Sequence, residues 1–238
     1  MAIPHIRLLC MEKKFSDAFT TALEAYTLPA SVKIEIHNFP LSQLPASFKF
    51  DTVVSPANSY GRLDGAFDDA ISRAFSPRDD YLALTRVAQR VLYKQWRGFA
   101  PPGTCTLVRI PDDFQPRANN VWGTKRVALC PTMRVPRDTR WDKEVVYECI
   151  WSLLCAIDTH NKNVKEGRAA EGEEEIQTVL MTPLATGCGR VSPERWATQL
   201  VLALTNYASA LEDEEKWSSL DWGTIDASAI EVERTWQM

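Results

Sequence analysis

The sequence predicts an α/β fold: a three-layer α/β/α sandwich in which helices cover both faces of a mixed, mostly parallel central sheet. Segments with strand periodicity alternate with segments of helical periodicity along the 238 residues. The run "IQTVLMTPLAT" (176–186) is continuously apolar, which is typical of a central strand buried on both faces. Ligands of such sheets bind at the carboxyl ends of the central strands. A functional site is therefore expected in the loops that follow these strands.

The first half of the chain alternates strands and helices. An apolar strand is expected at 6–10, and a helix at 12–26, where apolar residues recur every three or four positions. Segment 32–39 alternates apolar and polar residues, as a half-buried strand does. "FDTVVSPAN" (50–58) predicts a β-branched strand that ends in a turn, and 79–96 predicts a long helix with one broad apolar face.

The second half continues this alternation. "TCTLVRI" (104–110) and "RVALCPTM" (126–133) predict strands, and 142–160 predicts a helix with an apolar face. Segment 161–175 is charged and aperiodic, so an exposed loop is expected there. Ser192-Pro193-Glu194 predicts the start of a helix, with Ser as N-cap and Pro in the first turn.

One domain is expected over residues 1–210, with 161–175 as a charged loop within it. The remaining residues, 211–238, form an acidic C-terminal extension that carries Trp217, Trp222 and Trp236. Because tryptophans favour burial, we expect this extension to pack on the same domain.

Composition narrows the classes of partner. The formal net charge of −4 argues against a protein held to nucleic acid by phosphate neutralisation. The six cysteines form no C-x-x-C pair and only three histidines are present, so no metal or cofactor is expected. The N-terminal segment is too polar for a signal peptide, and no apolar run approaches transmembrane length. We therefore expect a soluble cytoplasmic or nuclear protein with no membrane partner.

Two strand ends carry unusual loops. "SPANSYGRLDGAF" (55–67) and "ATGCGRVSP" (185–193) both contain glycine and both lead into a helix N-terminus. Gly187 and Gly189 would let the backbone turn its N–H groups toward an anion. A plain connection is the alternative, since glycine-rich turns before helices are common. No nucleotide-hydrolysing P-loop motif and no G-x-G-x-x-G motif is present.

The first loop, in "DTVVSPANSYGRLDGAFDDAI" (51–71), resembles the first ligand loop of macro domains. The usual form of that loop is a strand, then Asn-Ala-Ala-Asn and a glycine-rich run ending Val-Asp-Gly-Ala-Ile. The segment is most similar to a variant in a divergent macro-like subgroup with an SPANSYG-x-LDG first loop. "PLATGCGRVSPERWA" (183–197) is similar to the second loop of the family, which wraps a diphosphate. The resemblance covers roughly residues 3–210.

The resemblance implies a three-layer fold that binds ADP-ribose and related metabolites. Some members only bind, whereas others hydrolyse ADP-ribosyl esters or remove phosphate from ADP-ribose 1''-phosphate. Asn58 matches the Asn that contacts the distal ribose, and Asp68 aligns with the Asp that assists attack by water. Catalytic roles are thus implied for Asp68 and Asn58. The implied ligand-binding residues are Ser55, Ala57, Asn58, Tyr60, Gly65, Ala66, Thr186, Gly187, Cys188, Gly189 and Arg190.

The chain departs from the family pattern at several positions. Ser55 stands where the family has its first Asn, Asp64 occupies a position that is usually Gly, and Asp69 replaces the Gly after the catalytic Asp. No acid follows the second strand, where the family binds adenine, and Asn38 is the nearest polar residue. Arg190 lies where an aromatic residue often stacks on the ribose.

Structural roles are the alternatives for these same side chains. Asp64 would be the N-cap of the following helix, with Asp68 and Asp69 complementing the helix dipole. Asn58 would form a turn, and Tyr60 would pack the loop. The Arg190 guanidinium would either neutralise a phosphate or face solvent.

The sequence supports hypotheses from different functional classes. The first is a hydrolase of an ADP-ribose derivative, in which Asp68 positions the attacking water. The second is a non-catalytic module that binds ADP-ribose, free or attached to a protein. The third is a degenerate domain that binds another nucleotide or a protein partner.

Overall fold

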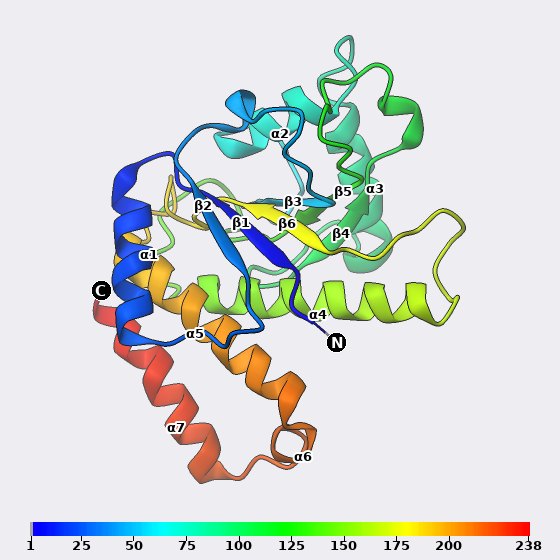
Figure 1. Cartoon of the computed structure of the whole chain (residues 1–238). Coiled ribbons are helices and arrows are strands. Elements are labelled where there is room, and N and C mark those ends of the chain that lie inside the picture. The colour runs from blue at the N-terminus through cyan, green and yellow to red at the C-terminus, as the bar shows by residue number, and fades with distance from the viewer. Residues whose placement is uncertain (1) are drawn as a thin grey trace.

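A six-stranded sheet forms the centre of the molecule in the computed structural model (Figure 1). The structure describes residues 2–238, so residue 1 of the expected domain lies outside it. The strands are β1 (His5–Leu9), β2 (Ile34–His37), β3 (Thr52–Ser55), β4 (Thr106–Arg109), β5 (Arg126–Leu129) and β6 (Thr178–Met181). Their order is β2-β1-β6-β3-β5-β4, and all neighbours are parallel except β4 and β5. The predicted mixed, mostly parallel sheet is confirmed.

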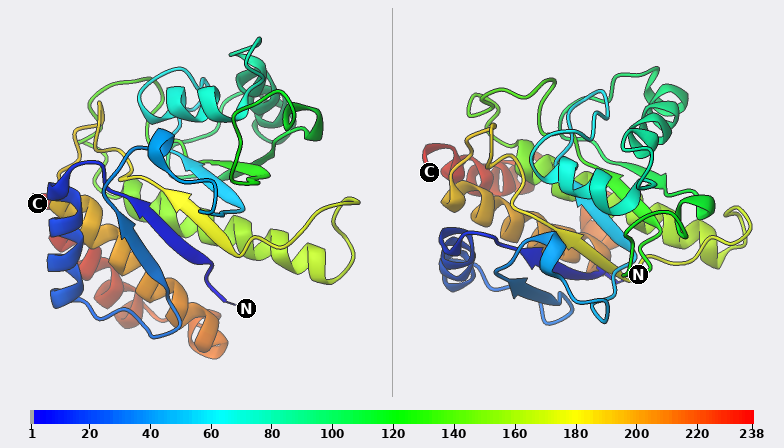
Figure 2. Two further views of the ribbon diagram at one scale, coloured as in Figure 1. Left: turned by 45° about the horizontal axis from the view of Figure 1, so that its top comes forward. Right: turned by 90° about the horizontal axis from the view of Figure 1, so that it is seen from above.

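Helices cover both faces of this sheet, as predicted. The longer helices are α1 (Lys13–Ala25), α2 (Phe67–Phe75), α3 (Ala83–Trp96), α4 (Val145–Lys165) and α5 (Pro193–Glu212). One hydrophobic core joins α1, α4 and α5 to one face, and a second joins α2 and α3 to the other. Figure 1 shows these two layers below and above the strands, and the views in Figure 2 show the same separation.

The central strands β3 and β5 are buried at every position, because helices cover both of their faces. β6 is buried at three of its four positions. The expected central strand within 176–186 is thus present, although its regular part is limited to Thr178–Met181. The fully buried Trp196 of α5 packs edge-on against Phe15, with ring centroids 5.8 Å apart.

The predicted start of α5 is confirmed. Ser192 is the N-cap, and its side chain accepts a hydrogen bond from the N–H of Arg195 at 3.1 Å. Pro193 occupies the first turn, where a missing N–H is not needed.

Segment 161–175 differs from the loop that the sequence predicts. α4 continues through its first five residues to Lys165, because Asn161 is buried and its amide bonds both backbone groups of Ile176. Further along, Glu173 forms ion pairs with the buried Arg126 and with Arg109. The charged run therefore includes a structural anchor.

Other boundaries also shift. β5 ends at Leu129 rather than at residue 133, since Pro131 has no N–H to donate to a ladder. α3 begins at Ala83, four residues after the expected start. Short 3-10 turns lie at η1 (Leu41–Gln43) and η2 (Asp112–Phe114).

The C-terminal extension forms α6 (Glu214–Trp217), α7 (Trp222–Glu233) and η3 (Arg234–Gln237). Trp217 packs against Trp151 of α4, with ring centroids 5.5 Å apart, and the Trp236 indole donates to Glu144 at 2.9 Å. Trp222, in contrast, is 77% exposed. Two of the three expected anchors thus contact the rest of the chain.

Within residues 2–238, no helix combines the length and the apolar character needed to cross a membrane. Four cysteines, Cys10, Cys105, Cys130 and Cys149, are buried as free thiols, whereas Cys155 and Cys188 are exposed.

Candidate functional site

The two loops singled out in the sequence leave the same edge of the sheet. We name them the β3 loop (residues 56–66) and the β6 loop (residues 182–192). β3 and β6 are parallel neighbours, with Thr52 opposite Val179 and Val53 opposite Leu180. Because parallel strands end at one edge, both loops begin side by side at their carboxyl ends. Figure 2 shows both loops at this edge.

A third segment connects them. The loop after β5 (residues 130–144, the β5 loop) pairs with the β3 loop through a bridge between Met133 and Asn58 and through the N–H of Ser59, which donates to the Met133 carbonyl at 3.0 Å. On its other side, the Met133 sulfur lies 3.6 Å from the Cys188 sulfur of the β6 loop. Both loops therefore contact the same residue.

The β6 loop presents free backbone donors. In the described part of the chain, the N–H groups of Thr186, Gly187, Cys188 and Gly189 donate to no other group of the protein. Gly187 and Cys188 are exposed. Four consecutive unpaired N–H groups ahead of a helix N-terminus are suited to an anion.

Gly189 is required by packing. A Cβ atom at this position would lie 2.4 Å from the Ala185 carbonyl oxygen and 2.8 Å from the Thr139 hydroxyl. The Gly189 carbonyl accepts the Thr139 N–H at 2.9 Å, which ties the β6 loop to the β5 loop. A Cβ at Gly187 would meet nothing within 4 Å, so open space lies in front of this residue.

Backbone strain is concentrated in the same loops. Among the described residues, four non-glycine residues have positive φ, and three of them are Ala66, Ala185 and Arg190. The fourth, Arg97, ends α3. Such conformations cost about 1–3 kcal/mol each and gather at functional sites.

Asn58 fixes the shape of the β3 loop. Its amide oxygen accepts the N–H groups of Tyr60 and Arg62 at 3.1 and 3.3 Å, and its amide nitrogen donates to the Arg62 carbonyl at 2.8 Å. One N–H of the amide remains for another partner. The side chain thus forms a turn and retains one donor.

Tyr60 packs at the rim of the β3 loop. Its ring lies 5.8 Å from that of Phe99, and its hydroxyl accepts a hydrogen bond from Arg134 at 3.0 Å. Arg190, on the β6 loop, has a 68% exposed side chain and lies 4.0 Å from Asp138.

α2 begins without a capping side chain. Its N-cap is Ala66, at φ 51° and ψ −124°, and no side chain accepts its first N–H groups. Asp64, the expected cap, instead forms an ion pair with Arg62. Asp68 and Asp69 do lie in the first turn of α2.

Asp68 is buried behind the end of β3. Its side chain accepts a hydrogen bond from the Ser55 hydroxyl at 2.6 Å, and the residue is only 6% exposed. Burial raises the pKa of Asp68 to about 7; the Ser55 hydrogen bond opposes this shift and the charge of Asp64 adds to it. A carboxyl group that exchanges protons near neutrality is therefore placed directly below the β3 loop.

The predicted site residues divide by exposure. The side chains of Ser55, Ala57 and Asp68 are buried, and Gly189 is buried as well. Those at the surface are Gly65, Ala66, Gly187, Cys188 and Arg190, while Asn58, Tyr60 and Thr186 are half-buried.

A hollow of about 560 Å³ lies beside the start of α2. It is bounded by the segment that follows β2, including Pro40 and Leu41, by Ala66 and Phe67, and by Trp122. Its lining is largely apolar, as a pocket for a flat ring requires.

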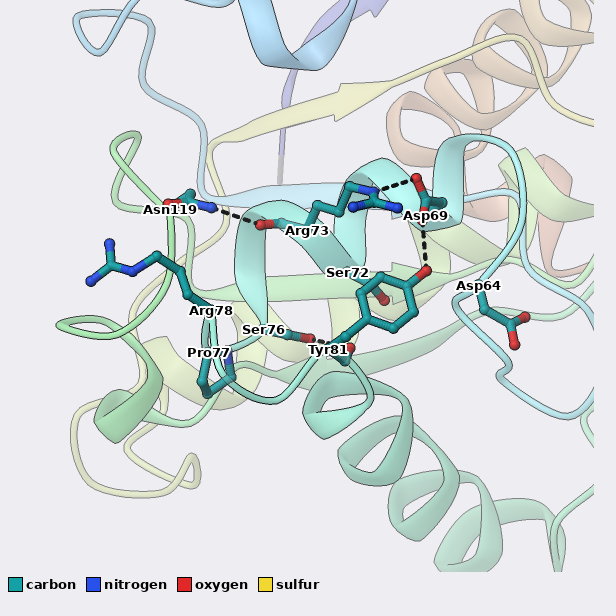
Figure 3. Close-up of a pocket in the computed structure, with 9 residues that line it drawn as sticks. All are labelled: Asp64, Asp69, Ser72, Arg73, Ser76, Pro77, Arg78, Tyr81 and Asn119. Atoms are coloured by element: carbon teal, nitrogen blue, oxygen red, sulfur yellow. Dashed lines mark hydrogen bonds and ion pairs between the residues drawn. The ribbon is translucent and has the colours of Figure 1, made fainter.

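A second, polar hollow of about 540 Å³ lies on the outer flank of α2 (Figure 3). There Asp69 accepts hydrogen bonds from Arg73 at 2.8 Å and from the Tyr81 hydroxyl at 2.7 Å. The Arg73 and Tyr81 hydrogen bonds lower the pKa of Asp69, whereas burial and Asp69 raise the pKa of Tyr81 to about 12. These side chains satisfy one another, and Asp64 lies apart from them in Figure 3.

Sequence reasoning missed the residues of the β5 loop. Met133 was assigned to a strand and Thr139 was not singled out; in the β6 loop, Ala185 was not singled out either. Pro131 directly after the β5 strand was the available signal, since it ends a ladder and so places Met133 in a loop at the same sheet edge. In residues 2–238, no group of three or more His, Cys, Asp or Glu side chains is arranged to hold a metal ion.

Of the comparisons with known proteins, the comparison with solved structures finds similar proteins. No family model and no curated protein matches the sequence. Among solved structures, a mutant of the Oceanobacillus iheyensis macrodomain aligns with 14% identity and a TM-score of 0.46, over 68% of this chain and 69% of that chain. The same macrodomain with ADP aligns with 15% identity and a TM-score of 0.45, over 68% and 75%. Another mutant with ADPR aligns with 11% identity and a TM-score of 0.36, over 69% and 89%. These TM-scores are below 0.5, and the matches therefore assign no role to any residue of this chain.

Proposed function

We propose that this protein binds ADP-ribose or a related nucleotide sugar between the β3 and β6 loops. The observation that carries the proposal is that both loops leave adjacent parallel strands and contact the same residue, Met133. A ligand with a diphosphate between two sugars needs hydrogen-bond donors both at the diphosphate and at the sugar hydroxyls. The β6 loop and the β3 loop supply such donors.

The β6 loop suits the diphosphate. The unpaired N–H groups of residues 186–189 can donate to phosphate oxygens without any lysine. The open space in front of Gly187 admits a ligand close to the backbone, and the exposed Arg190 guanidinium is available to neutralise charge.

The β3 loop and the start of α2 suit the two sugar ends. The remaining N–H of Asn58 can donate to a ribose hydroxyl. The apolar hollow beside Ala66 and Phe67 offers a surface for a nucleobase. The segment after β2 offers no acid to that hollow, and the Asp69 carboxylate that borders it is already hydrogen-bonded to Arg73 and Tyr81, so we expect weaker selectivity for adenine than a free buried carboxylate would give.

Calorimetry with ADP-ribose tests the binding proposal. The parent protein should bind ADP-ribose with a Kd in the micromolar range, about −8 kcal/mol. Gly187→Val places a side chain in front of the free N–H groups and should weaken binding at least about tenfold. Gly223→Val, an equal change in α7, is the matched control and should bind like the parent.

Two results would count against the proposal. One is a parent protein that fails to bind ADP-ribose. The other is a Gly187→Val variant that binds as tightly as the Gly223→Val control.

Hydrolysis is the second candidate function, favoured by the place of Asp68, whose carboxyl accepts a hydrogen bond from Ser55 at the end of β3, together with a pKa near neutrality. Asp64 is an exposed carboxylate of the same loop and directly precedes Gly65 and Ala66, so it is a second candidate for the acid that positions the attacking water. Phosphate release from ADP-ribose 1''-phosphate should be measured for the parent, Asp68→Asn and Asp64→Asn. If only one of the two variants loses turnover, the residue changed in that variant is the base. If the parent binds ADP-ribose but releases no phosphate, the protein is a binding module without hydrolase activity.

A further inference from the structure

A groove separates α5 from α7 on the far side of the helical layer. It has a volume of about 430 Å³ and is bordered by the second half of α5, by α6 and by α7. Figure 1 shows α5 and α7 as two arms joined through α6. The α7 residues that border the groove include Thr224, Ala227 and Ser228, which are too small to interdigitate with α5 and fill the space.

Aromatic side chains form a fixed floor. Tyr147 and Trp217 border the groove, and both pack on Trp151 of α4, with ring centroids 6.1 Å and 5.5 Å away. The Trp217 indole donates to the Ser209 hydroxyl at 3.1 Å, and Asn206 donates to the Tyr147 hydroxyl at 3.1 Å. The floor is therefore held in place by the protein itself, and Leu220, Ile225 and Val232 add apolar walls.

The rim of the groove is acidic. Glu144 and Glu231 border it, and the charges of both add to the effect of burial in raising the pKa of Tyr147, so both carboxylates lie near its hydroxyl. Lys216 is the basic residue on the rim. Residues 211–238 carry eight Asp and Glu against two Lys and Arg, a net charge of −6, which leaves +2 on residues 1–210.

We propose that this groove binds a basic amphipathic helix of another protein. Apolar side chains of that helix would lie on the aromatic floor, in the manner of an amphipathic helix in a hydrophobic groove. Its Lys and Arg residues would face the acidic rim, and the concentration of negative charge on the C-terminal extension would attract them. The proposal uses none of the residues assigned to the nucleotide sugar.

Fluorescence anisotropy with synthetic peptides on the full chain tests the proposal. The probe is a labelled amphipathic helix of Leu and Lys, and its counterpart has Glu in place of every Lys. The parent should bind the Lys peptide at least about tenfold more tightly than the Glu peptide. Binding should weaken with added salt, because charge pairs at an exposed rim are screened.

Variants locate the binding. Ser228→Trp fills the groove and should weaken binding of the Lys peptide at least about tenfold. Trp222→Ala removes a 77% exposed aromatic residue that does not border the groove, and should leave binding unchanged. Thermal unfolding of each variant shows that the fold is kept.

Three outcomes would overturn the proposal. Equal affinity for the Lys peptide and the Glu peptide would show that the acidic rim does not select a basic helix. Unchanged binding in Ser228→Trp would show attraction to the acidic extension without use of the groove. A dimer in analytical ultracentrifugation that Ser228→Trp dissociates would assign the groove to a second copy of the chain.

Discussion

Two adjacent acids of α2, Asp68 and Asp69, have pKa values shifted in opposite directions by their surroundings. Asp68 is buried against Ser55, and burial raises its pKa to about 7. Asp69 faces outward, where hydrogen bonds from Arg73 and Tyr81 lower its pKa. The difference follows from helix geometry, because consecutive residues point about 100° apart around the axis.

The first prediction concerns Asp68→Asn. Since folding raises the pKa of Asp68 above its ordinary value, the native state keeps a proton that the unfolded chain loses between about pH 4 and pH 7. The group therefore lowers the free energy of unfolding as pH rises through that window, by up to on the order of 4 kcal/mol. Asn cannot ionise, so the variant should lose this dependence and gain stability relative to the parent at about pH 8.

Urea unfolding at about pH 5 and about pH 8 measures the effect. Glu24→Gln, a change at an exposed acid of α1 that does not act on Asp68, should retain the pH dependence of the parent. An unchanged pH dependence in Asp68→Asn would show that this carboxyl is not the buried titrating group.

The second prediction compares two glycines of the β6 loop. Gly189→Ala forces a Cβ against the Ala185 carbonyl and the Thr139 hydroxyl, and should lower the free energy of unfolding by about 1–3 kcal/mol. Gly187→Ala meets open space and should change stability by less than about 0.5 kcal/mol. Chemical denaturation of both variants checks this, and equal losses would contradict the packing that places the loop.

At the scale of the element, the start of α2 is strained. Ala66 holds positive φ at the N-cap, a conformation that glycine adopts without steric cost. We predict that Ala66→Gly raises the free energy of unfolding by about 1 kcal/mol. Ala70→Gly, in the interior of the same helix, should lower it by about 1 kcal/mol. Thermal unfolding distinguishes the signs, and destabilisation by both changes would mean that Ala66 is not strained.

The repeat of apolar residues along the sequence predicts the type of several helices and strands, but it does not predict where all of them end. The helix at 12–26 and the strands at 6–10 and 50–58 were predicted correctly in type, because their apolar residues repeat regularly. The end of α4 was missed, because what continues it is a tertiary contact between Asn161 and Ile176. Local sequence does not contain that contact.

The candidate site was predictable only in part. The two glycine-bearing loops were found from their turn chemistry and helix starts. That β6 lies beside β3 could not be read from the sequence, because strands far apart in the chain pair through tertiary packing. The joining role of Met133 and the burial of Asp68 follow from that arrangement and were invisible for the same reason.

At the scale of the whole molecule, Gln199 joins the C-terminal extension to the domain. This fully buried side chain donates to the Lys143 carbonyl at 2.6 Å and to the Thr235 hydroxyl at 2.8 Å, and it accepts the Tyr147 N–H at 3.3 Å. It thus connects α5, the start of α4 and η3.

The fourth prediction is that Gln199→Leu releases this end of the chain. The change leaves buried polar groups without partners, which should lower the free energy of unfolding by about 2–4 kcal/mol. Trypsin should then cleave after the exposed Arg234 faster than in the parent. Gln177→Leu, at an exposed position, is the control, and equal cleavage rates in all three proteins would show that Gln199 does not hold the extension.

The joint action of the two loops is tested most directly by NMR titration of the backbone amides with ADP-ribose. The account predicts that amide signals of residues 57–66 and of residues 186–190 shift together and saturate at the same ligand concentration, because one molecule contacts both loops. Shifts confined to one loop, saturation at different concentrations, or no shift in either loop would contradict it.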